Sequence, residues 1–127
     1  MSFLKSLELS VDNVVLIRGL THLETLNLSF TLVTDSGLKK LSGLTALMSL
    51  NFDAHPITDA ELSALTRLTA LVSLNVSHSD ITNDGLSYLK PLKNLQSLSS
   101  DYCKVAAAEI KKLLSTALPN LVSFQPE

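Results

Sequence analysis

A short phrase of leucines returns every 24 residues along this chain of 127 residues. The phrase reads Leu-x-x-Leu-x-apolar, and its four full copies begin at Leu23, Leu47, Leu71 and Leu95. Ser100 takes the last apolar place of the fourth copy, and partial phrases begin at Leu4 and Leu121. A unit this short cannot bury its own apolar face, so the spacing predicts stacked repeats whose function lies on surfaces shared by several repeats.

A second pattern follows each of the three middle phrases. Tails that begin at Val33, Ile57 and Ile81 share a threonine, an acidic or amide residue and a leucine, and helical spacing continues to Leu41, Leu65 and Leu89. The threonines Thr34, Thr58 and Thr82 precede the helical runs and can cap them. We therefore predict one domain, 1–127, with units at 1–19 (truncated), 20–43, 44–67, 68–91, 92–117 and 118–127 (a terminal partial unit).

With these phrases and tails, the chain resembles the leucine-rich repeat family over essentially its whole length. The resemblance implies an α/β solenoid, a short horseshoe with about six parallel strands on its concave face and short helices on its convex face. The Val/Ile-Thr-Asp-x-Gly-Leu tail is similar to the plant intracellular and cysteine-containing subfamilies, whose members often serve as substrate-recognition arms of F-box ubiquitin ligases. Residues 93–127 resemble the last repeat and tail of a longer protein of this kind.

The resemblance also implies a function. We expect a non-enzymatic module that binds a protein or peptide through the concave sheet and the loop rim, in substrate recognition or defence signalling. The sequence itself also argues against an enzyme. There is no Gly-x-Ser-x-Gly sequence and no phosphate-binding loop, and His22, His55 and His78 occupy different places in different repeats. His55 and Cys103 share a place but lie two repeats apart, roughly 10 Å. We therefore expect no catalytic residue, metal ion or cofactor.

Composition limits the partners and the compartment. A net charge of −2 argues against a nucleic-acid binder that depends on phosphate contacts. No run of 18 apolar residues exists, and the first eight residues are too broken for a signal peptide, so we expect no membrane association. The single cysteine cannot form an internal disulfide. A reducing compartment, cytoplasm or nucleus, is the expected location.

Alternation along the predicted strands turns one set of side chains to solvent. One outward column contains Asn27, Asn51 and Asn75, which we expect to hydrogen-bond one another along the sheet, with ligand contact as the alternative. The next outward column is Ser10, Ser29, Asp53, Ser77 and Asp101. With Glu8, its carboxylates make this face mildly acidic, and a basic peptide is the expected ligand.

Larger side chains stand where each strand turns into a loop, in the column Val11, Phe30, Ala54, His78 and Tyr102. An aromatic residue on a loop that a rigid sheet supports is a usual binding anchor, although it could also fold over the loop beneath. The candidate partner-contacting residues are Phe30, Asn51, Asp53, Asn75, His78, Asp101 and Tyr102. The next column, Asp12, Thr31, His55, Ser79 and Cys103, is expected to turn inward and satisfy loop backbone groups.

The N-terminal end carries no polar cap. Phe3, Leu4 and Leu7 would leave an apolar end and an unpaired strand edge. Three explanations stay open: the chain is part of a longer solenoid, a second copy pairs with this edge as a homodimer, or a partner protein covers it. The alternative to the binding module is therefore a self-associating repeat fragment that dimerises through this edge.

Overall fold

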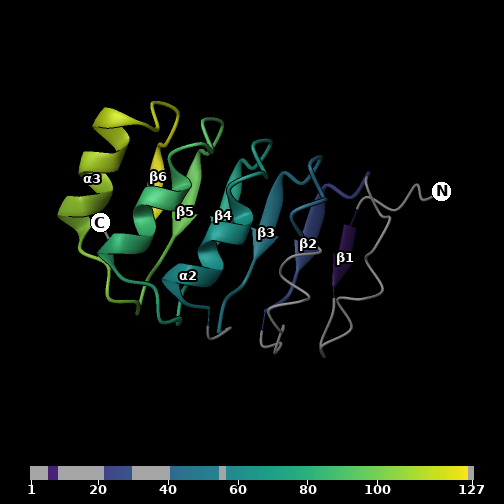
Figure 1. The fold of residues 1–127 in the computed structure, drawn as a ribbon, viewed down its shortest axis with the longest axis horizontal. Coiled ribbons are helices and arrows are strands. Elements are labelled where there is room, and N and C mark those ends of the chain that lie inside the picture. The colour runs from purple at the N-terminus through teal and green to yellow at the C-terminus, as the bar shows by residue number, and fades with distance from the viewer. Residues whose placement is uncertain (1–5, 9–21, 30–40, 55–56, 126–127) are drawn as a thin grey trace.

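Parallel strands in sequence order form the framework of the protein. The computed structural model describes residues 6–8, 22–29, 41–54 and 57–125. Within these ranges a single six-stranded sheet contains β1 (Ser6–Glu8), β2 (Thr25–Asn27), β3 (Ser49–Asn51), β4 (Ser73–Asn75), β5 (Ser97–Ser99) and β6 (Ser123–Gln125). Figure 1 shows the strands side by side in one row, as the repeat spacing predicts.

The strands pair in a constant register. Leu50 of β3 lies opposite Leu26 of β2 and Leu74 of β4, so each phrase of the sequence is set beside the same phrase of the next repeat. The backbone ladder continues past the strand ends, since the Phe52 N–H donates to the Asn75 carbonyl oxygen at 2.7 Å. Equivalent positions of successive repeats therefore stack in straight columns along the sheet.

Short helical segments return the chain from one strand to the next. They are α2 (Asp59–Leu62), which continues into the 3₁₀ helix η2 (Ser63–Leu65), the 3₁₀ helix η3 (Asn83–Leu89) and α3 (Ala107–Thr116). A 3₁₀ helix rises about 2.0 Å per residue and an α-helix about 1.5 Å, so η3 and α3 both span about 14–15 Å. The two extra residues of the last full unit thus let an α-helix cover the distance that η3 covers with fewer residues.

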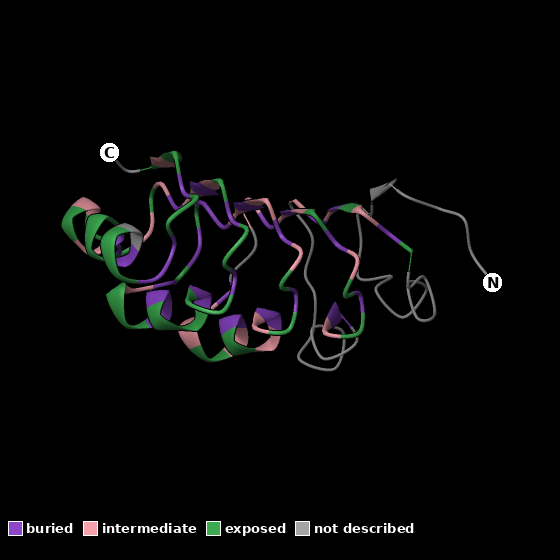
Figure 2. Ribbon diagram, turned by 90° about the horizontal axis from the view of Figure 1, so that it is seen from above, coloured by how far each residue is buried: buried purple, intermediate pink, exposed green. Residues whose placement is uncertain are grey.

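The core lies between the sheet and the helices, which form two layers with buried residues between them (Figure 2). Aliphatic or aromatic side chains fill each inward column almost without a break. The strand side contributes Leu23, Leu47, Leu71, Leu95 and Leu121, then Leu26, Leu50, Leu74 and Leu98, then Leu28, Phe52 and Val76; the helix side contributes Ile57, Ile81, Leu62, Leu86, Ile110, Leu41, Leu65, Leu89 and Leu113. Among the described residues, no helix has the length and apolar character that crossing a bilayer requires.

Ser100 is the exception to the apolar columns, as its place in the phrase predicts. It is buried in the column that also contains Phe52 and Val76, and both its hydroxyl and its N–H donate to the Gln125 carbonyl oxygen, at 2.7 and 2.8 Å. Burying a hydroxyl without a partner is costly. The second bond to Gln125 removes that cost and ties β5 to β6.

The starts of α2 and η3 are each bound to the next repeat. Asp59 Oδ1 accepts a hydrogen bond from the Thr82 N–H at 2.8 Å, and its other oxygen accepts from the Thr82 hydroxyl. One repeat later Asn83 Oδ1 accepts from the Ala106 N–H at 2.8 Å. We call these two contacts the inter-repeat latch. Ala107 occupies the following place, where the side chain has no acceptor.

The structure confirms the capping prediction for one threonine and corrects it for another. Thr82 does cap η3, because its side chain accepts from the Asp84 N–H at 3.3 Å. Thr58 makes no such bond, and its hydroxyl donates to Glu61 Oε1 at 3.1 Å. A side chain that binds across repeats leaves no signal in the helical spacing of its own repeat, so the sequence did not reveal the role of Asp59.

Gly85 makes room for the latch. A Cβ atom at this position would lie 2.2 Å from Asp59 Oδ1 and 3.2 Å from a methyl group of Ile81, while Gly85 itself is buried. The glycine therefore permits the close approach of a carboxylate from the preceding repeat.

The Gly85→Ala variant tests this packing. Alanine normally stabilises a helix relative to glycine, but here we expect the free energy of unfolding to fall by about 2 kcal/mol, because the new methyl group displaces a carboxylate that accepts two hydrogen bonds. Urea denaturation followed by circular dichroism measures the change. Ser87→Ala, at an exposed place in the same helix, should stay within about 0.5 kcal/mol.

Asp59→Ala supplies the second arm of the experiment. On that background Gly85→Ala should cost much less, since no carboxylate remains to be displaced. An equal cost in both backgrounds would show that the latch is not the reason for the glycine.

Candidate binding surface

The sheet face opposite the helices carries short polar side chains. Two of its columns are Thr25, Ser49, Ser73, Ser97 and Ser123, and Asn27, Asn51, Asn75, Ser99 and Gln125, all of them half-buried or exposed. We call this surface the open face. These two columns form a polar floor, and none of their residues is a Trp, Tyr or Arg, the side chains that usually dominate binding energy.

The asparagine column is a row of turns. Asn51 Oδ1 accepts from the Asp53 N–H at 2.8 Å, and Asn75 Oδ1 accepts from the Ser77 N–H at 3.0 Å, as Asn27 does with Ser29. The predicted hydrogen bonds between asparagines are therefore wrong: each side-chain oxygen turns its own chain at the end of a strand. Contact of Asn51 and Asn75 with a ligand stays a prediction.

Ser77 differs from its predicted outward position. It is buried, its hydroxyl lies 2.8 Å from the Ser99 hydroxyl oxygen, and it accepts from the Asp101 N–H at 3.1 Å. Its column neighbours Asp53 and Asp101 are only half-buried. The serine thus fixes the backbone on which Asp101 stands.

The rim beyond the strands has an unusual backbone. Ala54, His78 and Tyr102, one per repeat, have φ angles of 61°, 56° and 61°. Non-glycine residues seldom adopt this left-handed region. The ladder holds the first two of them there, because the Ala54 N–H donates to the Ser77 carbonyl at 3.0 Å and the His78 N–H donates to the Asp101 carbonyl at 2.9 Å.

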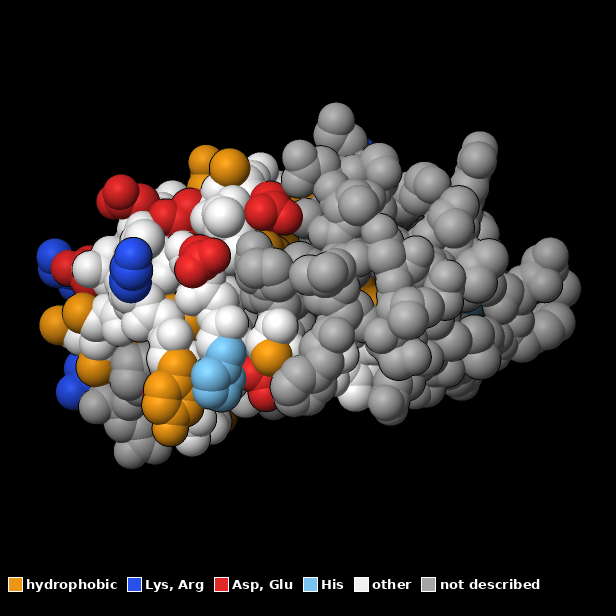
Figure 3. Space-filling view, turned by 90° about the horizontal axis from the view of Figure 1, so that it is seen from below, with side chains coloured by type: hydrophobic (Ala, Val, Ile, Leu, Met, Phe, Trp, Pro, Cys, Tyr) orange, Lys and Arg blue, Asp and Glu red, His pale blue; other side chains and the backbone are white. Residues whose placement is uncertain are grey.

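Three side chains on the rim contact one another in sequence. His78 Nδ1 lies 2.8 Å from Asp53 Oδ1, and the Tyr102 ring stacks on the His78 ring with centroids 4.5 Å apart and planes at 16°. Figure 3 views this side of the molecule and shows a histidine against a hydrophobic side chain, with a carboxylate nearby. We call Asp53, His78 and Tyr102 the rim trio. Tyr102 is 79% exposed, so the ring is outside the core.

The next column turns inward, as predicted. The Ser79 hydroxyl donates to the Val76 carbonyl oxygen at 2.6 Å and lies 3.3 Å from Cys103 Sγ, which donates to the same carbonyl at 3.2 Å. These contacts satisfy backbone beneath the rim, so Ser79 and Cys103 support the loops. Thr31 and His55 of this column lie outside the described residues.

An apolar border of the open face was missed by the sequence reasoning. Met48 is 44% exposed, Val122 is 80% exposed and Val72 is half-buried, at the place where the chain enters each strand. Strict alternation fails here, because the Met48 carbonyl oxygen accepts from two successive N–H groups, those of Val72 and Ser73, at 2.7 and 3.0 Å. The sequence did contain a signal for this border. The first two leucines of each phrase are three positions apart and both point inward, so the two residues between them must both point outward.

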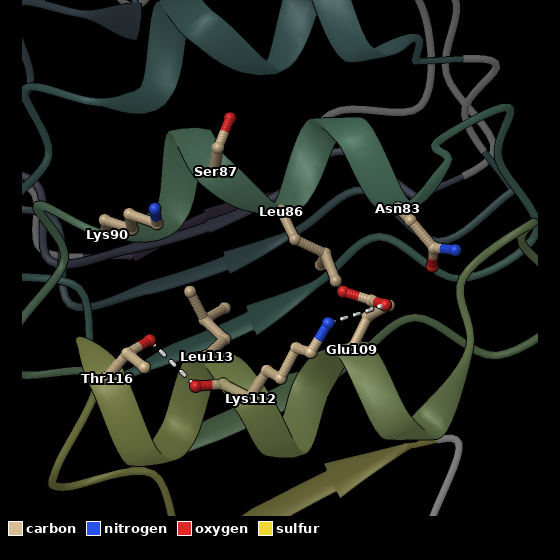
Figure 4. Close-up of a pocket in the computed structure, with 8 residues that line it drawn as sticks. All are labelled: Asn83, Leu86, Ser87, Lys90, Glu109, Lys112, Leu113 and Thr116. Carbon is tan, nitrogen blue, oxygen red and sulfur yellow. Dashed lines mark hydrogen bonds and ion pairs between the residues drawn. The ribbon is translucent and has the colours of Figure 1, made fainter.

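A groove of about 370 Å³ lies on the other side of the molecule, between η3 and α3. Leu86 and Leu113 form its floor, and Lys112 Nζ lies 3.6 Å from Glu109 Oε1 (Figure 4). Lys90 ends η3, where a positive charge offsets the partial negative charge of a helix C-terminus. The helices themselves thus account for the charges in the groove, and we assign it no ligand.

The rim trio offers recognition chemistry. His78 contacts a carboxylate and an aromatic ring, and no hydroxyl or thiol in the described part of the chain hydrogen-bonds to it. The same part contains no group of three His, Cys, Asp or Glu side chains that could hold a metal ion. Such an arrangement can stack on a planar group and attract positive charge.

The structure brings together Asp53, His78 and Tyr102 among the predicted binding residues, and it places Asp101 next to Tyr102 in the chain. Phe30 lies outside the described residues, as do Phe3 and Leu4 of the predicted self-association edge. Leu7 lies in β1, where its partner in the sheet is Leu26.

Comparisons with known proteins agree with this architecture. A family model described as a leucine-rich repeat matches residues 19–42 and 67–90, and no curated protein sequence matches the chain. Among solved structures, the internalin inlF of Listeria monocytogenes aligns with a TM-score of 0.70 and 28% identity over 90% of this chain and 31% of its own. Internalin C2 (inlC2) of the same organism aligns with a TM-score of 0.72 and 24% identity over 95% of this chain and 51% of its own.

A third likeness, to the structure of the TLR13–ssRNA13 complex, has a TM-score of 0.62 and 23% identity over 92% of this chain and 16% of the other. The fold is an α/β leucine-rich repeat solenoid, and these matches support the leucine-rich repeat family for this chain. Proteins built from this repeat typically mediate protein–protein interaction without catalysis. The chain spans about a third and about a half of the two internalins that it matches.

Ala54→Gly tests the left-handed rim. Glycine adopts positive φ without steric cost, so we expect the free energy of unfolding to rise by up to about 1 kcal/mol. Ala60→Gly, at an exposed place in α2, is the control and should lower it by about 0.5–1 kcal/mol. Urea denaturation measures both variants, and a fall at position 54 as large as that at position 60 would contradict the observed backbone.

Tyr102→Ala tests the stack. Because the ring is largely exposed, stability should change by less than about 1 kcal/mol, while the ring protons of His78 should shift in NMR spectra once the tyrosine ring is gone. Tyr102→Phe should preserve the His78 signals. A large fall in the melting temperature of Tyr102→Ala would instead show that the tyrosine ring stabilises the fold. Unchanged His78 signals in that variant would contradict the stacking of the two rings.

Proposed function

We propose that this chain is a non-enzymatic binding module that takes a protein or peptide on the open face and the rim of its sheet. The observation that carries the proposal is the rim trio, in which three successive repeats contribute one side chain each. Tyr102 is exposed, yet His78 and Asp53 orient it. A side chain that is ordered before binding loses less conformational entropy on contact.

The rest of the open face suits an extended ligand. Its floor is polar, one border carries Met48 and Val72, and the other carries the rim trio. With strands about 4.8 Å apart, six of them give a width of roughly 24 Å. A peptide that crosses this floor can place an apolar side chain at one border and a basic or planar one at the other.

The wider setting is also part of the proposal. The partial coverage of the two internalins supports a role as the recognition segment of a larger protein. The resemblance of the repeat tail to plant proteins favours substrate recognition or defence signalling. A single cysteine favours the cytoplasm or the nucleus.

Selection from a random peptide display library against the immobilised chain tests the function. We expect enriched peptides whose dissociation constants, measured by fluorescence anisotropy, rise at least about tenfold in Tyr102→Ala and in Ser73→Arg, which places a bulky charge on the floor. Ser87→Arg, on the helix side, is the matched control and should bind as the unmodified chain does.

Two results would overturn the proposal. One is a library that yields no enriched peptide. The other is a set of peptides whose affinity falls in Ser87→Arg and is unchanged in Ser73→Arg and Tyr102→Ala, which would move the binding surface to the helices.

A further inference from the structure

One face of the Tyr102 ring packs against another ring, and much of the side chain is exposed to solvent. The used face stacks on His78 at a centroid distance of 4.5 Å, and the side chain is still 79% exposed. No other ring contact involves Tyr102 in the described part of the chain. An aromatic face that solvent can reach will attract a cation or a planar group, because the ring carries negative charge density on its face.

His78 and the backbone of the rim support the Tyr102 ring. Tyr102 and His78 both have left-handed backbones, at φ 61° and 56°, and His78 is tethered to Asp53 at 2.8 Å. Backbone strain of this kind persists where the surrounding structure enforces it, and it is common at ligand-binding sites. The ring is therefore packed, on one face, against a neighbour that is itself tethered.

A carboxylate residue directly precedes Tyr102 in the chain. This residue is Asp101, its N–H donates to the Ser77 hydroxyl at 3.1 Å, and its carbonyl oxygen accepts from the His78 N–H at 2.9 Å. Its backbone is fixed, but its half-exposed carboxylate has no hydrogen-bond or ion-pair partner among the described residues. Two unused recognition elements, an aromatic face and a carboxylate, thus occur on consecutive residues.

We infer that Tyr102 and Asp101 form a site for the guanidinium group of an arginine side chain in the partner. The inference rests on the proposed function and names the residue that the rim selects. The planar guanidinium stacks on the open face of Tyr102, while its N–H groups donate to the Asp101 carboxylate. Asp53 adds negative charge to the same rim.

Other ligands fit this chemistry less well. A lysine ammonium can pair with Asp101, but it is not planar and cannot stack and donate two parallel hydrogen bonds at once. A nucleic-acid base could stack on Tyr102, but its phosphates would meet the carboxylates of Asp53 and Asp101. An apolar side chain would leave Asp101 without a partner.

NMR titration of the isotope-labelled full chain with N-acetyl-arginine amide tests the site. We expect saturable shifts that centre on residues 101 and 102 and the His78 ring. N-acetyl-lysine amide should bind at least about fivefold more weakly, and N-acetyl-citrulline amide, which keeps the planar group without its charge, weaker still. Uridine monophosphate serves as the nucleotide probe and should cause no shift at Tyr102.

Variants assign the two contacts. Tyr102→Leu and Asp101→Asn should each weaken binding of the arginine probe at least about fivefold. Asp84→Asn, an exposed carboxylate on the helix side, is the matched control and should leave the affinity unchanged. Equal affinity for the arginine and lysine probes, shifts spread over all the carboxylates, or a stronger response to the nucleotide would overturn the inference.

The two proposals fail in different ways. If library peptides bind the open face but replacing their arginines with lysine costs nothing and the arginine probe does not bind, the arginine site is wrong and the proposed function stands. If the arginine probe binds at Tyr102 but no peptide depends on Ser73 or Tyr102, the proposed function is wrong.

Discussion

The parallel backbone ladder connects every repeat to the next in the same register, and the rest of the molecule depends on it. From β2 to β5, residue i lies opposite residue i + 24, and the hydrogen bonds continue through Phe52 and His78 beyond the strands. A slip of one residue would turn each buried leucine to solvent. The length of the repeat therefore fixes both the core and the composition of each surface column.

The rim trio is a consequence of the same spacing. Parallel strands lie about 4.8 Å apart, and the His78 and Tyr102 rings, which occupy one column in adjacent repeats, stack at 4.5 Å. Planar side chains at equivalent places are thus within stacking distance without any special loop. The contact of His78 with Asp53 adds a third repeat to this row of side chains.

Periodicity was sufficient to predict the strands, the inward leucines, the buried place of Ser100 and the supporting role of Ser79 and Cys103. It also selected Asp53, His78 and Tyr102 as candidates, because large or charged side chains stood out in polar columns. The contacts among them could not be predicted, since a column says which residues are neighbours but not how their side chains turn.

Other features depend on geometry that the phrase does not encode. Asn51 and Asn75 turn their own strands instead of pairing with each other, because a backbone N–H two residues away is nearer than the next asparagine side chain. Asp59 reaches Thr82 only where Gly85 leaves space. The outward position of Met48 was not predicted, because two successive outward residues break the alternation expected of a strand.

The left-handed rim separates backbone shape from side-chain identity. Ala54, His78 and Tyr102 differ greatly in size and polarity, yet their φ angles agree within a few degrees, and carbonyl oxygens of the neighbouring repeat accept from the N–H groups of Ala54 and His78. A point substitution at these sites can exchange one chemical group for another while the loop keeps its course. Substitutions at positions 54, 78 and 102, natural or engineered, can therefore change which partner is recognised without a redesign of the solenoid that carries these side chains.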